Sequence, residues 1–152
     1  MKLRTLIHHV VGFLHIMKNE TSVMRVLEKV AESVDPVSSA RLAAALVYKN
    51  EIISIGTNKH KSHPFQKKYS SNDAAIFLHA ETDAIYNALR RYDTDIVAKS
   101  KMYIYRAKYV NQEKMVFTQG LARPCSGCQK AIATFGIQHV CYTLNDEGMD
   151  YL

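Results

Sequence analysis

The chain has 152 residues, 47% of them hydrophobic and 22% charged, a balance that argues against a disordered protein and fits one globular domain. Its three cysteines do not make a disulfide framework, so we expect a reducing, cytoplasmic setting and a metal or redox site. The net charge of +6 favours a phosphate-bearing partner, either a nucleotide or a nucleic acid, but a generally basic surface would give the same value.

The first predicted element is a helix over residues 3–17, whose apolar part covers residues 6–17 and carries three histidines. This stretch is shorter than the roughly 20 apolar residues that span a bilayer. It also lacks the small-residue cleavage site of a signal peptide. We therefore expect a packed helix within a single domain over residues 1–152, and no membrane partner.

A second helix is predicted over residues 22–34, because apolar side chains recur there at helical spacing. Either Thr21 or Ser22 is expected to cap its first turn, and Pro36 disfavours helix at the residue before it. The apolar positions are Val23, Val26, Leu27 and Val30.

Two strands over residues 41–48 and 51–55 follow, and a tight turn at residues 49–50 joins them into a predicted β-hairpin. We expect Gly56 to end the second strand. Residues 57–73 then form a long polar loop, which in a compact domain is usually functional or mobile. Its basic residues are Lys59, His60, Lys61, His63, Lys67 and Lys68.

The rest of the pattern predicts a helix over residues 79–91, strands over 101–109 and 111–117, a helix over 125–135 and a strand over 138–144. Helices and strands therefore alternate along most of the chain. Such alternation predicts an α/β protein with a mixed sheet and helices on its faces.

Two short motifs indicate a chemistry: His79-Ala80-Glu81 and Pro124-Cys125-Ser126-Gly127-Cys128. The first is weak by itself, because a lone histidine on a helix is more often a packed or surface residue. The Cys-x-x-Cys spacing is stronger, because it lets two thiolates meet one metal ion. One histidine and two thiolates leave a fourth zinc position open for water, and a nearby carboxylate can then move protons.

Two other interpretations of the cysteine pair stay open. A Cys-x-x-Cys at a helix start is also the form of a thioredoxin-like redox pair, because the helix dipole lowers the thiol pKa. A structural zinc site would need a fourth protein ligand, either Cys141 or a loop histidine. The preceding Pro124, and the histidine and carboxylate on another helix, favour a catalytic zinc ion over both.

The paired motifs resemble the H-x-E…P-C-x-x-C signature of the cytidine and deoxycytidylate deaminase superfamily, and the chain is most similar to its deoxycytidylate deaminase branch. The similarity extends to Gly56-Thr57-Asn58, to Lys130-Ala131-Ile132 and to Gly136-Ile137, and covers residues 41–144. The resemblance implies a three-layer α/β/α sandwich around a mixed central sheet of about five strands.

The resemblance also implies roles for the site residues. His79, Cys125 and Cys128 would bind one catalytic Zn²⁺ ion, with water in the fourth position. Zinc hydroxide would attack the amino-bearing carbon of the base, and Glu81 would shuttle the proton toward the departing ammonia.

Three substrate contacts are implied as well, at Asn58, the backbone of Ala80, and Pro124. The chain departs from the family pattern in extra residues around 106–123. This insert would either line the substrate entrance or contact another copy of the chain. The resemblance to the family implies a homo-oligomer. The loop at 57–73 has histidines but no cysteines, so we expect no second, structural zinc ion.

The leading hypothesis is zinc-dependent hydrolytic deamination of a free cytosine nucleotide, such as dCMP to dUMP, with the basic loop after Asn58 contacting one phosphate. These lysines would equally be solvated surface groups. The second hypothesis is a deaminase acting on cytosine or adenine within single-stranded nucleic acid or tRNA, with Phe65, Tyr69 or Tyr109 stacking on an extruded base. The third is a non-catalytic structural zinc module.

Overall fold

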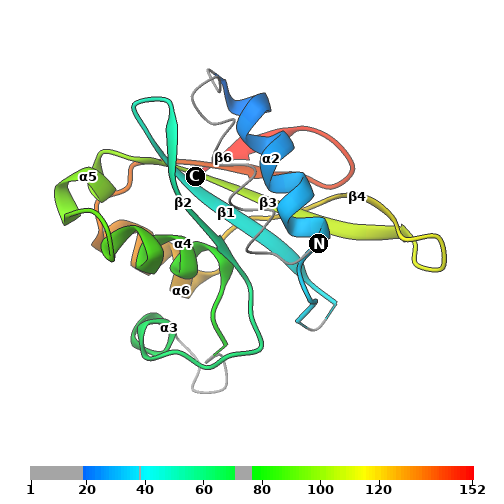
Figure 1. Cartoon of the computed structure of the whole chain (residues 1–152), viewed down its shortest axis with the longest axis horizontal. Coiled ribbons are helices and arrows are strands. Elements are labelled where there is room, and N and C mark those ends of the chain that lie inside the picture. Colours follow the sequence, from blue (N-terminus) through cyan, green and yellow to red (C-terminus); the bar gives the residue numbers. More distant parts are fainter. Residues whose placement is uncertain (1–18, 38, 71–76) are drawn as a thin grey trace.

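The computed structural model of the protein describes residues 19–37, 39–70 and 77–152 (Figure 1). The helix predicted over residues 3–17 lies outside the described residues. The helices are α2 (Glu20–Glu32), α3 (Pro64–Tyr69), α4 (Ala80–Leu89), α5 (Thr94–Ala98) and α6 (Ser126–Thr134). The strands are β1 (Arg41–Tyr48), β2 (Glu51–Thr57), β3 (Lys101–Asn111), β4 (Val116–Gly120), β5 (His139–Thr143) and β6 (Met149–Tyr151). No helix in the described ranges is long and apolar enough to cross a membrane.

The strands form one mixed sheet in the order β2-β1-β3-β5-β6, and β4 pairs with β3 outside this path. β1 is antiparallel to both β2 and β3, with Leu46 opposite Ser54 on one side and Met102 on the other. β3 is a shared strand: its first half runs parallel to β5, and its second half, from Arg106, pairs with the antiparallel β4. The predicted mixed sheet is confirmed, with six strands in place of about five.

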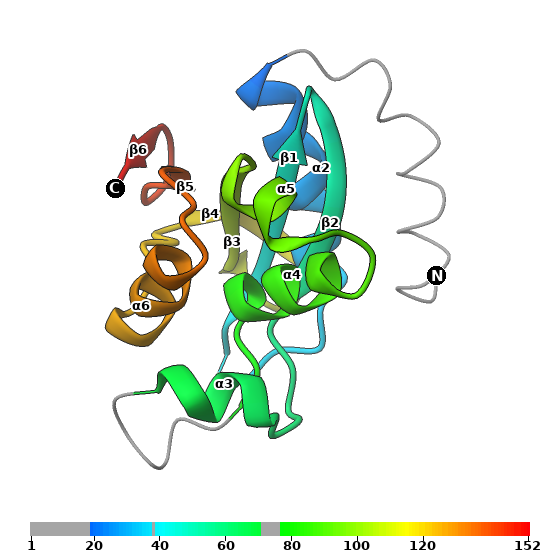
Figure 2. The same ribbon diagram turned by 90° about the vertical axis from the view of Figure 1, so that its left-hand side faces the viewer.

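Helices cover both faces of the sheet, which confirms the three-layer arrangement (Figure 2). α2 lies on one face, where Leu27 and Val30 are fully buried beside β1 and β3. α4 and α6 lie on the other face, where Ile85 and Ala131 are buried in one cluster with Leu46. Removing these apolar side chains from water is the main force that holds the layers together.

Gly56 does not end β2, contrary to the expectation, because the strand continues to Thr57. Glycine is needed here for another reason. A Cβ atom at this position would overlap the Ala84 nitrogen and the Ala80 carbonyl oxygen of α4. The absence of a side chain therefore lets α4 pack directly on β2, and this contact positions the first turn of that helix.

The loop predicted over residues 57–73 contains the short helix α3. The Nδ1 atom of His63 caps it by accepting a hydrogen bond from the Phe65 N–H at 3.1 Å. Pro64 occupies the first helical position, where its missing N–H has no intrahelical partner to lose. Phe65 stacks on Phe135 at a centroid distance of 5.8 Å. A helix of six residues depends on such tertiary contacts, and it is too short for hydrophobic periodicity to reveal.

Smaller differences concern the ends of elements. Asn19, and not Thr21 or Ser22, caps α2 by accepting a hydrogen bond from the Ser22 N–H at 2.9 Å. β4 begins at Val116 because residues 112–115 form the turn of the β3–β4 hairpin. α5 and β6 were not predicted, since a helix of five residues and a strand of three carry no usable pattern.

We predict that Gly56→Ala lowers the free energy of unfolding by about 1–3 kcal/mol, because α4 must move away from β2 to admit the methyl group. Urea denaturation measures this change. Gly120→Ala is the matched control: a Cβ there meets the Arg106 Cδ at 3.1 Å, and that flexible side chain can move. Equal losses in the two variants would contradict the close packing of α4 on Gly56.

Candidate active site

The first motif lies at the start of α4. His79 is the N-cap residue of this helix and has an extended backbone, but its side chain makes no capping hydrogen bond. The imidazole is partly buried, and its Nδ1 atom faces the sulfur atoms of the second motif. The N-cap position therefore directs a metal-binding type of side chain away from its own helix.

The second motif lies at the start of α6. Cys125 is the N-cap residue, and its sulfur accepts a hydrogen bond from the Cys128 N–H at 3.5 Å. Cys128, one turn further on, is fully buried, whereas Cys125 is exposed. Both sulfur atoms lie at the positive end of the helix, where a thiolate is stabilised.

The three side chains meet at one point. The His79 Nδ1 lies 3.5 Å from the Cys125 Sγ and 3.3 Å from the Cys128 Sγ, and all three atoms lie within 4.8 Å of one another. A tetrahedral zinc ion with Zn–S bonds of about 2.3 Å and a Zn–N bond of about 2.0 Å sets N···S separations of about 3.5 Å. The donor atoms therefore fit zinc. Among the described residues no fourth His, Cys, Asp or Glu joins this group.

Interactions within the cluster favour a thiolate. Hydrogen bonds from Cys128 and His79 lower the pKa of the Cys125 thiol to about 3. The same contact with Cys125, together with burial, raises the pKa of Cys128, and the hydrogen bond with Cys125 raises the pKa of His79. At neutral pH the cluster therefore holds a thiolate at Cys125, and the thiolate is the form of cysteine that binds a metal ion.

Glu81 lies beside this cluster, but its carboxylate oxygens are not among the three candidate ligand atoms that lie close together. It belongs to the first turn of α4, is only 4% exposed, and places its carboxyl group against the Cys128 thiol. Burial raises the pKa of this carboxyl above its ordinary value. A raised pKa makes a carboxyl group a better carrier of protons at neutral pH.

The geometry gives no support to the two other interpretations of the cysteine pair. Cys141 lies on β5 in the core between the sheet and α2, on the face opposite α4 and α6. The Nε2 atom of His60 lies 2.6 Å from the Pro36 carbonyl oxygen, and His63 caps α3. A structural zinc site therefore gains no fourth ligand from them, and a redox pair would not call for His79 between its sulfur atoms.

Asn58, predicted to contact the substrate, lies buried just after β2. Its Oδ1 accepts a hydrogen bond from the Leu42 N–H at 2.8 Å, and its Nδ2 donates to the Ala40 carbonyl at 2.9 Å. The amide therefore joins the end of β2 to the start of β1. One N–H and one lone pair of the amide remain for another partner.

Ala80 and Pro124 flank the cluster from the two helix starts. Ala80 is the first residue of α4, so its N–H has no acceptor within the helix. Pro124 is buried directly before Cys125, and its carbonyl accepts a hydrogen bond from the Gln129 Nε2 at 2.8 Å.

Two buried polar residues near the site were not predicted. The Gln66 Oε1 accepts a hydrogen bond from the His79 N–H at 3.1 Å. The Asp83 carboxylate accepts a hydrogen bond from the Thr57 N–H at 3.0 Å and pairs with the Lys59 ammonium group. Asp83 follows His79 by four residues and so shares its helix face, which was the one available signal. Gln66 carried none, because its partners lie on another helix.

A family model describing the zinc-binding region of cytidine and deoxycytidylate deaminases matches residues 17–144 of the chain. The match includes both motifs and every element from α2 to β5. A comparison with curated protein sequences found no match.

Solved structures share the fold. A dCMP deaminase from the cyanophage S-TIM5 in apo form is 19% identical with a TM-score of 0.53, over 83% of this chain and 86% of that one. The same phage enzyme in complex with dCMP and dUMP is 20% identical with a TM-score of 0.53, over 84% of each chain. A cytidine deaminase from Burkholderia pseudomallei is 16% identical with a TM-score of 0.61, over 89% and 92%.

We predict that metal analysis of the purified protein finds zinc. Loss of a residue that only supports a metal ligand lowers metal affinity by up to roughly 100-fold. Because Cys128 is a proposed ligand itself, we expect Cys128→Ser to lower the zinc affinity by more than that. Zinc content after dialysis against a chelator measures this loss. Cys141→Ser is the matched control, because it removes a buried thiol from the opposite face of the sheet. Equal zinc contents in the two variants would show that Cys128 is not a ligand.

Proposed function

The chain belongs to the cytidine and deoxycytidylate deaminase family, and we propose that its substrate is a free cytosine nucleotide. Family membership makes the protein a zinc-dependent deaminase, a hydrolase that removes the amino group from a nucleotide base. The observation that carries the proposal is the meeting of the His79 nitrogen with the Cys125 and Cys128 sulfurs beside the buried Glu81.

In this proposal His79, Cys125 and Cys128 hold the zinc ion. Zinc, when bound, lowers the pKa of a coordinated water and so makes water a nucleophile at neutral pH. The Glu81 carboxylate takes a proton from the attacking water and gives it to the amino group, which leaves carbon C4 of the cytosine as ammonia. A C–O bond replaces the C–N bond, and the product is a uracil nucleotide.

Asn58, Ala80 and Pro124 position the substrate in the same proposal. The Ala80 N–H, which lacks a helical acceptor, donates to the ring carbonyl of the base. Asn58 offers its remaining N–H and lone pair to a sugar hydroxyl or to the base. Pro124 contributes apolar surface beside the metal-binding sulfur of Cys125.

The segment that follows Asn58 supports a contact with one phosphate. The Lys59 N–H donates to the Leu78 carbonyl at 3.0 Å, and the Leu78 N–H donates to the Lys61 carbonyl at 3.1 Å. Residues 59–61 therefore run beside the residue that precedes His79. The Lys61 side chain is exposed there, and we assign its ammonium group to the phosphate.

Other basic groups of this segment are already engaged. The Lys59 ammonium pairs with the buried Asp83 carboxylate, and the His60 ring is bonded to the Pro36 carbonyl. Their contacts hold the segment in place and leave less positive charge for a ligand. This distribution supports a small ligand with one phosphate over a long polyanion.

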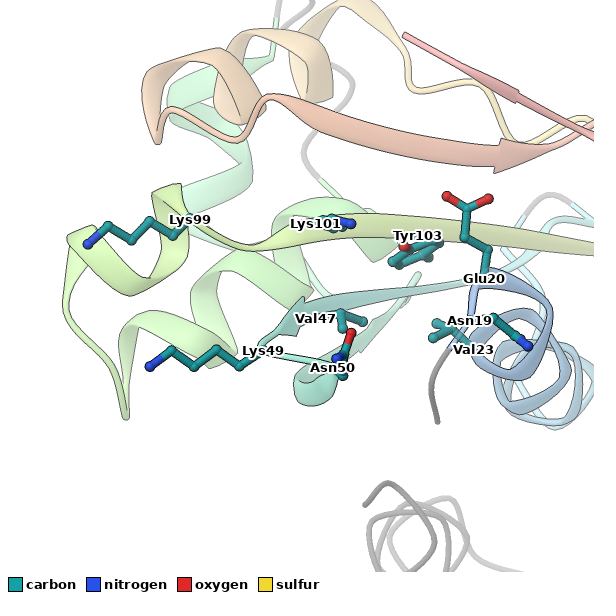
Figure 3. Close-up of a pocket in the computed structure, with 9 residues that line it drawn as sticks. All are labelled: Asn19, Glu20, Val23, Val47, Lys49, Asn50, Lys99, Lys101 and Tyr103. Atoms are coloured by element: carbon teal, nitrogen blue, oxygen red, sulfur yellow. The ribbon is translucent and has the colours of Figure 1, made fainter. Parts of the chain in front are cut away.

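Much of the net charge lies elsewhere. Lys49, Lys99 and Lys101 line a pocket at the start of α2 and the β1–β2 turn (Figure 3). Lys99 there pairs with Asp95 at 2.9 Å. Part of the basic charge therefore lies at this pocket, and charge by itself does not favour a nucleic acid substrate.

The aromatic residues named for a nucleic acid substrate already pack against other parts of the protein. Phe65 stacks on Phe135, and Tyr69 is 4% exposed. Tyr109 stacks on Phe117 at a centroid distance of 4.7 Å. A base that stacked on these rings would have to compete with these contacts, which favours the free nucleotide.

The β3–β4 hairpin accounts for the extra residues around 106–123. Near its turn Val110, Met115 and Val116 are 66%, 56% and 45% exposed. Exposed apolar side chains at this position support a contact with a second copy of the chain over a role at the substrate entrance. We therefore propose a homo-oligomer. The three cysteines are unpaired, which suits a reducing compartment, and for this reason we propose that the protein is cytoplasmic.

We predict that Glu81→Gln lowers kcat for cytosine deamination by about 10²–10⁴-fold, because the amide cannot carry the proton. We expect the zinc content of this variant to stay at the wild-type level, since the candidate ligand atoms belong to His79, Cys125 and Cys128. Glu28→Gln, an exposed acid-to-amide change on α2, serves as the control. Wild-type turnover by the Glu81 variant would refute its role.

We predict that the protein deaminates dCMP with a higher kcat/KM than deoxycytidine, and that Lys61→Met raises KM for dCMP about two- to fivefold, the size of an exposed ion pair. Ammonia release from dCMP, CMP, deoxycytidine and cytidine measures this preference. Lys49→Met is the control at the pocket of Figure 3. Equal kcat/KM for dCMP and deoxycytidine would contradict the proposal that the substrate is a nucleotide. Salt-dependent binding and faster turnover of a single-stranded oligonucleotide would favour the second hypothesis.

A further inference from the structure

We propose that Gln66 is a positioning residue of the metal site: from α3 it holds the first turn of α4 so that the His79 imidazole faces the two sulfurs. The inference rests on the proposed function only in taking the cluster of His79, Cys125 and Cys128 as the zinc site. It adds a residue outside both sequence motifs.

The contacts of Gln66 are unusual for a residue in a polar segment. Gln66 is only 1% exposed. Its Oε1 accepts hydrogen bonds from the His79 N–H at 3.1 Å and from the Thr82 hydroxyl. Its Nε2 donates to the Ser70 Oγ at 3.4 Å. Because a buried amide without partners is costly, these bonds fix the orientation of the side chain.

The start of α4 needs this acceptor for a specific reason. A helix N-terminus is commonly secured by a capping box, in which the third helical residue accepts a hydrogen bond from the N-cap N–H. The third residue of α4 is Thr82, whose hydroxyl is a donor to the Gln66 Oε1 and, at 3.1 Å, to the His79 carbonyl. Gln66 therefore supplies from α3 the acceptor that the His79 N–H requires. The imidazole of His79 makes no capping bond and can point to the sulfurs.

α3 is firmly placed for this task. His63 caps its start, and Phe65 packs against Tyr86 of α4 at 5.7 Å and against Phe135, which ends α6, at 5.8 Å. α3 thus contacts both helices that carry the proposed ligands, and it lies below them in Figure 2. A residue on this helix is therefore held relative to both motifs.

The contact with α6 is direct. A Cβ atom on Gly127 would lie 2.8 Å from the Tyr69 carbonyl oxygen, so the first turn of α6 rests on the last turn of α3. Gln66 binds the first turn of α4 from the same short helix. Loss of its oxygen would therefore let His79 shift relative to Cys128, while the hydrophobic contacts of α3 remain.

The test compares zinc-loaded Gln66→Met, which keeps the side-chain length but removes the acceptor, with Gln66→Glu, which keeps the acceptor. Lys67→Met is the matched control at the next, exposed position of α3. The readouts are the rate of zinc release to a chromogenic chelator and the visible absorption spectrum of the cobalt-loaded protein. We expect Gln66→Met to release zinc about 10- to 100-fold faster and to change the cobalt spectrum. We expect Lys67→Met to stay close to the wild type, and Gln66→Glu, whose buried carboxyl keeps the acceptor in its protonated form, to lie closer to the wild type than Gln66→Met.

A merely structural role would lower the melting temperature of Gln66→Met but leave its cobalt spectrum unchanged. Wild-type zinc release and a wild-type spectrum in that variant would overturn the proposal. Should Gln66→Met not fold, Thr82→Val decides: several-fold faster zinc release supports the positioning role, and a wild-type rate overturns it. A wild-type protein that holds zinc but deaminates no cytosine substrate would overturn the proposed function alone.

Discussion

The N-termini of two helices, α4 and α6, lie next to each other, and the site depends on their relative position. α4 delivers His79 and Glu81, and α6 delivers Cys125 and Cys128. Both helices are seated by direct contact between backbones: α4 lies on Gly56 of β2, and α6 lies on the end of α3 at Gly127. Backbone contacts leave little freedom to adjust. Such seating suits a metal ion, whose ligand distances tolerate only small errors.

The two helix starts also set the electrostatics of the site. Each presents first-turn N–H groups that have no acceptor within the helix backbone, and the positive end of a helix dipole. The thiolate of Cys125 lies in this positive field, whereas the Glu81 carboxyl is buried and its pKa is raised. One arrangement therefore keeps negative charge on the Cys125 sulfur and favours the proton on the neighbouring Glu81 carboxyl. In the proposed function, the separate roles of ligand and proton carrier follow from the position of each residue along its helix.

The parts that could be predicted from the sequence are those whose signal is local. The Cys125-x-x-Cys128 spacing and the regular pattern of Val23 to Val30 are examples, and both lie on the helices expected for them. The errors arose where tertiary contacts decide. A glycine after a run of strand-forming residues predicts the end of the strand, but Gly56 lies within β2 and allows α4 to pack closely on it. Gln66 is polar and lies in a polar segment, and only the fold shows that it is buried against His79.

The shared strand β3 has a consequence for the order in which the protein becomes complete. The hairpin of β1 and β2 and the pairing of β3 with β4 are local in sequence, whereas the parallel pairing of β3 with β5 encloses β4 and α6. Non-local pairings of this kind are slow to form, since the entropy of closing the intervening chain is lost before the new contacts compensate for it. That pairing also brings Cys125 to His79 across 46 residues. A zinc ion at this point would bind the folded chain in preference to the unfolded one, and so would stabilise the whole fold.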